Sequence, residues 1–220
     1  MWCIGHLIEE YRSRMYGLPD LYALPYFLRE PVVCIDEKSK QILKDTRTAL
    51  PPKPGVAAKQ DDEYKRVRTC NLFVAVEPKG ERRIVEVTLR RTKVDFVSFV
   101  CRLLKSVYAT ARKVHLVLDN LNTHFRASFE EVLGRRAATA LLRRIEFHYT
   151  PKHASWLNMA EIENGILERH QCLRRRLKDL ATVTLEVAAW QKRRNASRCG
   201  IVWSFTRQDA DRKLARHYVS

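Results

Sequence analysis

Three acidic residues occupy positions from which they could bind a metal ion together. Asp36 follows the apolar run of residues 31–35, Asp119 follows the apolar run of residues 114–118, and Glu161 lies near the start of a predicted helix. If the two runs are neighbouring strands, both aspartates lie at one edge of the sheet and the glutamate approaches from the side. Carboxylate oxygens are hard ligands, so this set predicts Mg²⁺ or Mn²⁺ rather than zinc.

Each of these residues also has a simpler interpretation. An aspartate after a strand often forms a turn by accepting a hydrogen bond from its own backbone, and Asp119 fits that role. Glu161 lies three residues after Asn158 and could close a capping box at the helix start. On a helical wheel Glu163 lies nearer the apolar stripe than Glu161 does, so the residue pattern leaves both open as the third ligand.

The rest of the chain supplies the elements that would position these residues. Apolar runs predict five strands, and the turn signal at residues 78–81 predicts that the first three form an antiparallel meander. A helix at residues 94–111 then crosses over, which makes the following strand parallel to one of the first. This order is that of the ribonuclease H-like fold, an α/β architecture whose five-stranded mixed sheet, three antiparallel and two parallel strands, is flanked by helices. The predicted strands are residues 31–35, 71–76, 83–89, 114–118 and 144–149.

Other stretches carry weaker signals. Residues 1–30 predict a short helix followed by an extended, irregular lead-in, because prolines recur there. Residues 44–69 predict a long loop or a small protruding hairpin. Helices are predicted at residues 126–143, from Asn158 through Leu177, and at residues 182–196 and 206–217.

Composition favours a nucleic-acid partner. The 220 residues include 41 Lys and Arg against 25 Asp and Glu, a formal net charge of +16, which attracts polyanions. An ordinary basic protein or a membrane-surface binder is the competing interpretation. The six cysteines form no CxxC pair and are predicted to be reduced thiols. No signal peptide or long apolar stretch is visible, which predicts a cytoplasmic protein without a membrane partner.

Several further residues are candidates for supporting roles. His124 is predicted to lie just behind the metal ligands, and Asn120 to orient its neighbour Asp119. Basic side chains of the C-terminal third are candidates for contacts with the DNA backbone, although a solvated helix face explains them equally well. These are Arg174, Arg175, Arg176, Lys192, Arg193 and Arg194.

Four segments resemble one known family. VCIDEKSKQIL, NLFVAVEP, VHLVLDNLNTH and FHYTPKHASWLNMAEIE are similar to the catalytic domain of bacterial insertion-sequence transposases, insertion sequence 630 group of the mariner superfamily, with a DDE active site. The resemblance runs from about Asp20 to the C-terminus. It implies that Asp36, Asp119 and Glu161 are the metal ligands, with Glu163 as the fallback for the third. It also implies two Mg²⁺ or Mn²⁺ ions that support phosphoryl transfer.

The resemblance further implies the biology of DNA transposition. The same site would cut the element's ends and join them to target DNA at TA dinucleotides, in a homodimer associated with the bacterial nucleoid. The family usually carries a helix-turn-helix region before the catalytic domain, so a separate helix-turn-helix polypeptide is a further expected partner. We predict a lead-in at residues 1–30, a remnant of a linker, a catalytic domain at 31–180 and a basic helical extension at 181–220.

Two other functions fit the same features. One is a transposase remnant that binds nucleic acid but no longer cuts it. The other is a ribonuclease that acts on RNA–DNA hybrids.

Overall fold

A mixed five-stranded sheet forms the centre of the computed structural model, which describes residues 9–48, 50–57, 61–169, 173 and 175–214. The strands are β1 (Val32–Asp45), β2 (Tyr64–Glu77), β3 (Arg82–Thr88), β4 (Val114–Leu118) and β5 (Ile145–Tyr149), arranged in the order β3-β2-β1-β4-β5. β1, β2 and β3 pair antiparallel, while β4 is parallel to both β1 and β5. The predicted ribonuclease H-like sheet is therefore confirmed.

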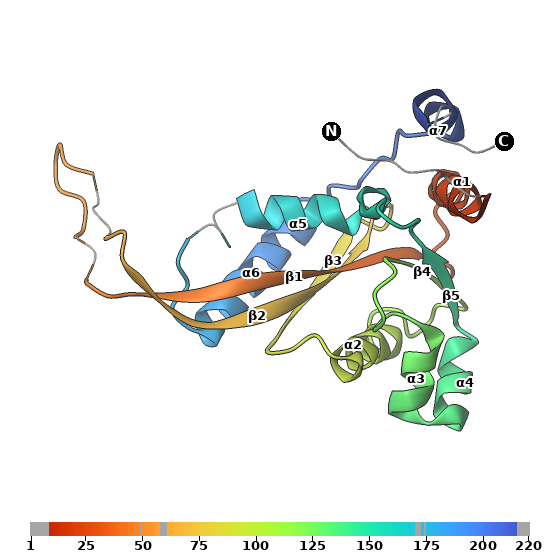
Figure 1. Cartoon of the computed structure of the whole chain (residues 1–220), viewed down its shortest axis with the longest axis horizontal. Coiled ribbons are helices and arrows are strands. Elements are labelled where there is room, and N and C mark those ends of the chain that lie inside the picture. Colours follow the sequence, from red (N-terminus) through yellow and green to blue (C-terminus); the bar gives the residue numbers. More distant parts are fainter. Residues whose placement is uncertain (1–8, 49, 58–60, 170–172, 174, 215–220) are drawn as a thin grey trace.

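The first two strands are much longer than predicted. β1 and β2 pair from Cys34 with Val76 out to Asp45 with Tyr64, and their outer halves extend as an arm beyond the helices (Figure 1). Of the two predictions for residues 44–69, the protruding hairpin is confirmed and the long loop was too wide, because the chain leaves the ladder only between 46 and 63. The outer part of β2 is exposed on both faces, so no apolar run marks it as a strand.

The lengthening of β1 also changes the setting of Asp36. We expected this residue after the end of the first strand, but it is the fifth residue of a 14-residue strand. Its backbone is therefore held within the ladder of β1 and β2, where it is paired with Val74, unlike a loop residue.

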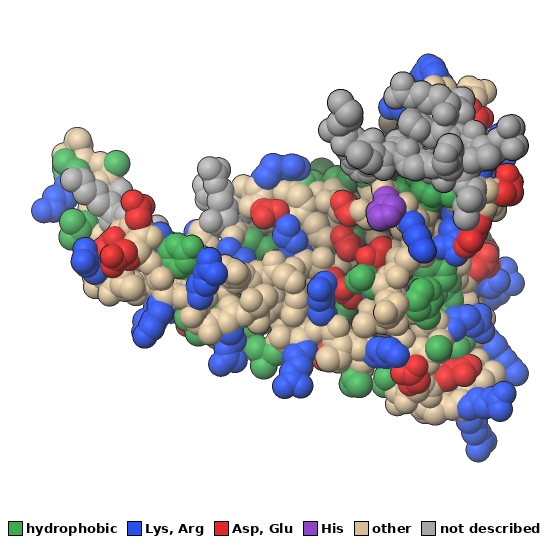
Figure 2. Space-filling model, in the orientation of Figure 1, with side chains coloured by type: hydrophobic (Ala, Val, Ile, Leu, Met, Phe, Trp, Pro, Cys, Tyr) green, Lys and Arg blue, Asp and Glu red, His purple; other side chains and the backbone are tan. Residues whose placement is uncertain are grey.

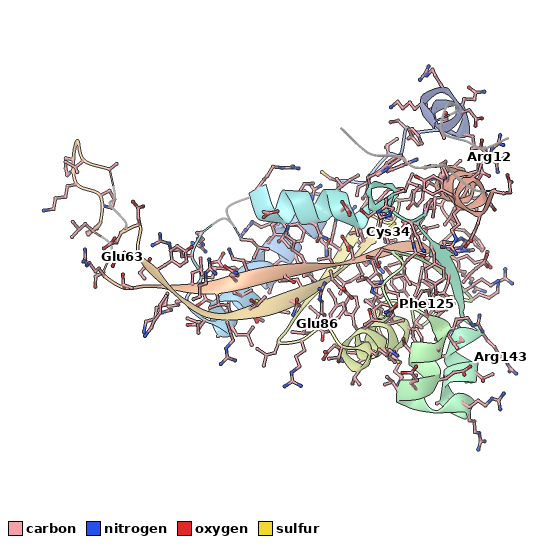
Figure 3. The ribbon with its side chains drawn as sticks, in the orientation of Figure 1. Arg12, Cys34, Glu63, Glu86, Phe125 and Arg143 are labelled. Atoms are coloured by element: carbon pink, nitrogen blue, oxygen red, sulfur yellow. The ribbon has the colours of Figure 1, made fainter. Side chains whose placement is uncertain are left out.

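Helices cover both faces of the sheet (Figure 1). On one face α2 (Lys93–Lys105), α3 (Arg126–Leu133) and α4 (Arg135–Leu142) pack over the side chains of Val33 and Ile35. On the other face α5 (Ala160–Arg169) and α6 (Leu180–Ala196) pack over Cys34 and Ile42. Cys34 lies at the middle of the sheet near the start of α5 (Figure 3). Because side chains alternate along a strand, Asp36 faces the α5 side with Cys34.

The N-terminal region is more regular than predicted. α1 (Glu9–Ala23) continues through Pro19, where we expected an extended lead-in. The helix buries Met15, Leu18 and Tyr22 against the sheet, and this packing outweighs the hydrogen bond that the proline removes. The predicted apolar positions before residue 9 lie outside the described residues.

Three other helix predictions need correction. The helix predicted at 94–111 ends at Lys105, and the one predicted at 126–143 is divided by Gly134, whose φ of 76° ends α3. The helix predicted from Asn158 through Leu177 begins after a short 3-10 turn (Ser155–Leu157) and ends at Arg169, and residues 175–178 are not helical. α6 is confirmed, and α7 (Arg207–Leu214) lies beside α1. Among the described helices, none could cross a bilayer by length and apolar character.

Candidate metal centre

The two aspartates are brought together by the register of β1 and β4. This parallel pair matches Val32 with His115 and Cys34 with Val117, residues 83 positions apart. Asp36 and Asp119 have the same separation (119 − 36 = 83), so they continue that register two residues beyond the last pair. Asp119 comes directly after the end of β4, close enough for its charge to act on Asp36.

Glu161 reaches this place from the first turn of α5. Asn158 fixes the start of that helix to the sheet, because its Nδ2 donates to the Ile35 carbonyl oxygen (2.8 Å) and its Oδ1 accepts from the Ala160 backbone N–H (3.1 Å). In a capping box the backbone N–H of Asn158 would donate to the Glu161 carboxylate. Here that N–H donates to the Ser155 carbonyl oxygen instead (2.7 Å). The exposed carboxylate of Glu161 is therefore available for another role.

The three carboxylates act on one another electrostatically. The pKa of Asp36 is raised to about 6, first by burial and then by the negative charges of Glu161 and Asp119. Hydrogen bonds from the backbone N–H of Glu37 (2.8 Å) and from Asn164 oppose this rise. The site thus concentrates negative charge, and Figure 2 shows acidic side chains gathered near the middle of one face with Lys and Arg around them.

The three carboxylates lie near one another, but their oxygens are too far apart to bind one ion together. Within the described part of the chain, only His115, Glu146 and His148 form a trio whose ligand atoms all lie within 4.8 Å of one another. Asp36, Asp119 and Glu161 do not meet that distance, so their oxygens would have to move inward to share an ion.

Glu163 is committed elsewhere. Its side chain is fully buried and its Oε1 accepts from Nε (2.9 Å) and Nη2 (2.6 Å) of Arg83. Arg194 donates to the same carboxylate through Nε (3.1 Å) and Nη2 (3.0 Å). Two guanidinium groups neutralise this charge, so the geometry argues against our fallback assignment of Glu163 as the third ligand. Arg194, which we predicted to contact DNA, forms this internal ion pair in the structure.

His124 lies against the Asp119 carboxylate. It is fully buried, with Nδ1 2.6 Å from Asp119 Oδ1 and Nε2 2.9 Å from Glu37 Oε1. Burial alone would lower the pKa of His124, but the hydrogen bonds and charges of Asp119 and Glu37 outweigh it and raise that pKa to about 9. The ring is therefore a buried imidazolium that fixes the Asp119 carboxylate by ion pairing.

Two asparagines play different parts from those expected. Asn120 donates to the Thr150 carbonyl oxygen (2.5 Å) and accepts from Arg14 (2.7 Å), so it ties together the ends of β4, β5 and α1. Its hydrogen bonds do not go to Asp119. Asn164, which sequence reasoning missed, donates from Nδ2 to Asp36 Oδ2 (2.7 Å). Its position three residues after Glu161, on the same helix face, was the available signal.

The candidate DNA-binding residues are divided among several roles. Arg176 pairs with Asp45 (2.8 Å) and donates to backbone carbonyls of the hairpin connection, so it is structural. Arg175 is exposed and pairs with Glu186. Lys192 and Arg193 are exposed on α6, while Arg174 lies outside the described residues. Three of the six candidates therefore remain available at the surface: Arg175, Lys192 and Arg193.

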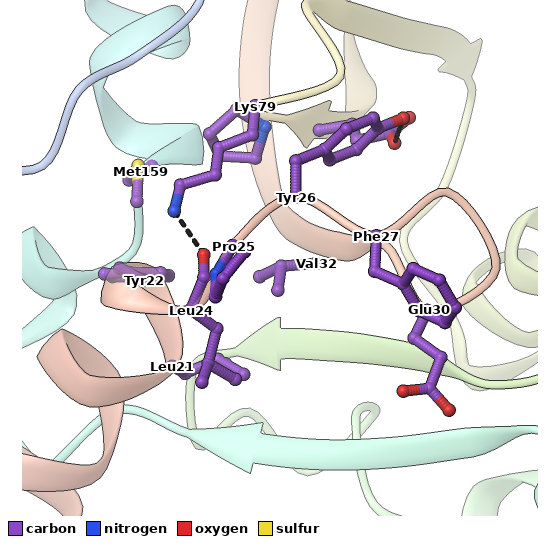
Figure 4. Close-up of a pocket in the computed structure, with 12 residues that line it drawn as sticks. Leu21, Tyr22, Leu24, Pro25, Tyr26, Phe27, Glu30, Val32, Lys79 and Met159 are labelled. Atoms are coloured by element: carbon purple, nitrogen blue, oxygen red, sulfur yellow. Dashed lines mark hydrogen bonds between the residues drawn. The ribbon is translucent and has the colours of Figure 1, made fainter.

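A small pocket lies away from this site. It opens between the α1–β1 connection and the β2–β3 turn, where Lys79 donates to the Leu24 carbonyl oxygen (Figure 4). Its volume of about 30 Å³ is enough for a water molecule, and the three carboxylates do not line it.

Comparison with known proteins identifies the family. The model of the DDE superfamily endonuclease family matches residues 31–184. The chain belongs to that family. The match confirms the DDE catalytic domain that the motifs predicted. No curated protein sequence matches the chain significantly.

Solved structures share the fold of this DDE domain. A pre-cleavage Mos1 transpososome matches with a TM-score of 0.59 at 15% identity, over 99% of this chain and 65% of that one. The Mos1 strand transfer complex gives 0.58 at 16% identity, over 99% and 64%. The Mos1 mariner paired-end complex with Mn gives 0.57 at 15% identity, over 99% and 65%. The chain thus spans less than two thirds of the length of these Mos1 transposases.

Proposed function

We propose that this DDE domain is the catalytic part of a transposase, which cleaves DNA phosphodiester bonds and joins DNA strands with the help of divalent metal ions. The observation that carries the proposal is that Asp36 and Asp119 continue the register of β1 with β4, with the charges of Glu161 and Asp119 acting on Asp36. Membership of an endonuclease family and a fold shared with Mos1 transposase complexes support it.

The residues present suit Mg²⁺ or Mn²⁺. All three donors are carboxylate oxygens, which hard cations prefer. Burial and the nearby charges of Glu161 and Asp119 raise the pKa of Asp36, and a cation bound between the three carboxylates would stabilise the charged form of Asp36. Two such ions, when bound, would lower the pKa of an attacking water or activate a 3′-hydroxyl, and would stabilise the leaving oxygen.

The chain's own groups would set the geometry of that reaction. Asp36, fixed within β1 and held by a hydrogen bond from Asn164, would be one of the metal ligands. Asp119, paired with the buried His124 imidazolium, would keep one carboxylate orientation. Glu161 is the exposed member of the set and would adjust its position as DNA enters.

The finer assignments extend the same proposal. We place the chain in the insertion sequence 630 group of bacterial mariner-superfamily transposases, acting near the nucleoid. It would cut transposon ends, insert at TA dinucleotides and work as a homodimer, with a separate helix-turn-helix polypeptide as a further partner. Arg175, Lys192 and Arg193 would contact the DNA backbone. Support for this group comes from the four motifs quoted above, and the presence of all three carboxylates favours an active domain over an inactive remnant.

A nicking assay on duplex DNA tests the proposal. Wild type, Asp119→Asn and Glu168→Gln are compared with Mg²⁺ or Mn²⁺ present, and circular dichroism checks that each protein is folded. Glu168 is a matched control because it is an exposed carboxylate on the same helix as Glu161. We expect nicking by wild type and Glu168→Gln, and a loss of about 100-fold or more in Asp119→Asn, since metal-assisted charge stabilisation contributes several kcal/mol. Equal activity in all three proteins, or none in any, would refute the proposal.

A further inference from the structure

Two histidines and a glutamate lie together on the outer strands of the sheet. His115 on β4 is the register partner of Glu146 on β5, and His148 lies two residues beyond Glu146 on the same strand. Because side chains alternate, all three point to one face. The side chains are 14%, 44% and 22% exposed, so the group is half-buried but open to solvent.

The distances within this group suit one tetrahedral metal ion. His115 Nδ1 lies 3.0 Å from His148 Nε2, while Glu146 Oε2 lies 3.9 Å from His115 Nδ1 and Glu146 Oε1 lies 3.7 Å from His148 Nε2. With zinc bonds of about 2.0–2.1 Å, ligand atoms in a tetrahedron are about 3.3–3.4 Å apart. The two Glu146 distances involve different oxygens, whereas one oxygen and the two ring nitrogens lie within 4.8 Å of one another. Movement of the Glu146 carboxylate toward the two rings would therefore complete the site.

The group is separate from the carboxylate centre. His115 precedes Asp119 by four residues on β4, a distance of about 13 Å along an extended strand. Its donor set also differs, because two imidazole nitrogens and one carboxylate favour zinc-like ions over Mg²⁺. The three protein ligands would leave a fourth position for water or an outside ligand.

A purely structural explanation is a histidine pair linked by a hydrogen bond, next to an ion pair of Lys113 with Glu146 (3.0 Å). The ion pair is a weak competitor, since both side chains are about 40% exposed and such surface pairs contribute little.

We propose that His115, Glu146 and His148 form a binding site for one divalent transition-metal ion of the zinc class, which would link the edge strand β5 to β4. Nitrogen ligands from two strands and a carboxylate that faces both of them carry this inference. It does not depend on the proposed transposase activity.

Cobalt binding tests the site directly. Untagged, metal-free chain with its accessible thiols alkylated is titrated with Co²⁺, and the visible absorption of tetrahedral cobalt is recorded before and after displacement by Zn²⁺. We expect one such ion per chain in the wild type and in Asp119→Asn. In His148→Gln and Glu146→Gln the affinity should fall at least about 10-fold, the loss that even an outer neighbour of a ligand can cause.

A matched histidine variant controls for surface binding. His153 is exposed and lies outside the group, so His153→Gln should keep the cobalt signal. Zn²⁺ should also raise the melting temperature of wild type and His153→Gln but not of His148→Gln. If His148→Gln does not fold, Glu146→Gln tests metal binding in its place, because it changes a half-exposed side chain. Equal binding in wild type and Glu146→Gln, or no binding at micromolar cobalt, would overturn the proposal.

Discussion

Replacing Asp36 by asparagine should stabilise the metal-free protein at neutral pH. The pKa of Asp36 is raised to about 6 from an ordinary value of 3.8, because burial and two nearby carboxylates disfavour its charge. A raised carboxyl pKa contributes stability that is fully present below pH 3.8 and is lost as the pH rises through about 6. Asparagine has the same size but no charge, so the variant does not lose this stability as the pH rises.

The size of the effect follows from the shift. About two pKa units at about 1.4 kcal/mol each correspond to roughly 3 kcal/mol at pH 7.5, and to about half of that at pH 5. Since Asp36 lies at the edge of an open site, solvent screening makes this an upper bound. Saturating Mg²⁺ should make the wild type more stable than Asp36→Asn, because only the wild type would gain the free energy of metal binding.

Urea denaturation of wild type and Asp36→Asn measures this. Unfolding curves are collected at pH 5 and 7.5 in EDTA, and at pH 7.5 in Mg²⁺. Asp62→Asn is the control, because this exposed aspartate lies in the connection between β1 and β2, away from the site. The reasoning is refuted if Asp36→Asn is less stable than wild type in EDTA at pH 7.5, or if the difference does not change with pH.

Three other changes have definite expected outcomes. Glu163→Gln should lower the free energy of unfolding by about 3–5 kcal/mol, because it removes the charge that balances the buried Arg83 and the partly buried Arg194. Glu161→Gln should change it by less than about 0.5 kcal/mol, and similar urea midpoints for the two variants would contradict this. Asn164→Ala removes the hydrogen bond to the proposed ligand Asp36 and should weaken Mn²⁺ binding about 10- to 100-fold, as measured by calorimetry. Unchanged Mn²⁺ affinity would count against a role of Asn164 in positioning Asp36. Burial raises the pKa of Cys34 to about 12, so iodoacetamide at pH 8 should label the exposed Cys199 before Cys34, as followed by mass spectrometry. Labelling of Cys34 as early as Cys199 would refute this.

Much of the sheet could be predicted from the sequence because its central strands are buried on both faces. Such strands appear as short apolar runs, and the runs before Asp36 and Asp119 are clear cases. The interval between those two aspartates equals the register of β1 with β4, so the local pattern and the long-range pairing agree. What the apolar runs could not show is where β1 and β2 end, since their outer halves are solvated.

The helical errors have similar physical causes. Pro19 is an ordinary signal for a break, yet packing of α1 against the sheet overrides it. Arg175 and Arg176 were assigned to a helix because basic residues followed an apolar period, but Arg176 is drawn to Asp45 and to carbonyl oxygens of the hairpin connection. The conformation at Arg176 depends on a contact between residues more than a hundred positions apart. A local sequence pattern cannot reveal such a contact.

The two glutamates of α5 show how a correct geometric prediction can suggest the wrong chemistry. The helical wheel indicated that Glu163 faces inward, and it does, but Arg83 and Arg194 lie 80 and 31 positions away and were invisible to the wheel. These arginines neutralise Glu163 and fix α5 to β3 and α6. Two residues earlier, about 200° around the helix, Glu161 keeps its charge exposed next to Asp36. The buried glutamate therefore positions the helix, and the exposed one is left to bind metal.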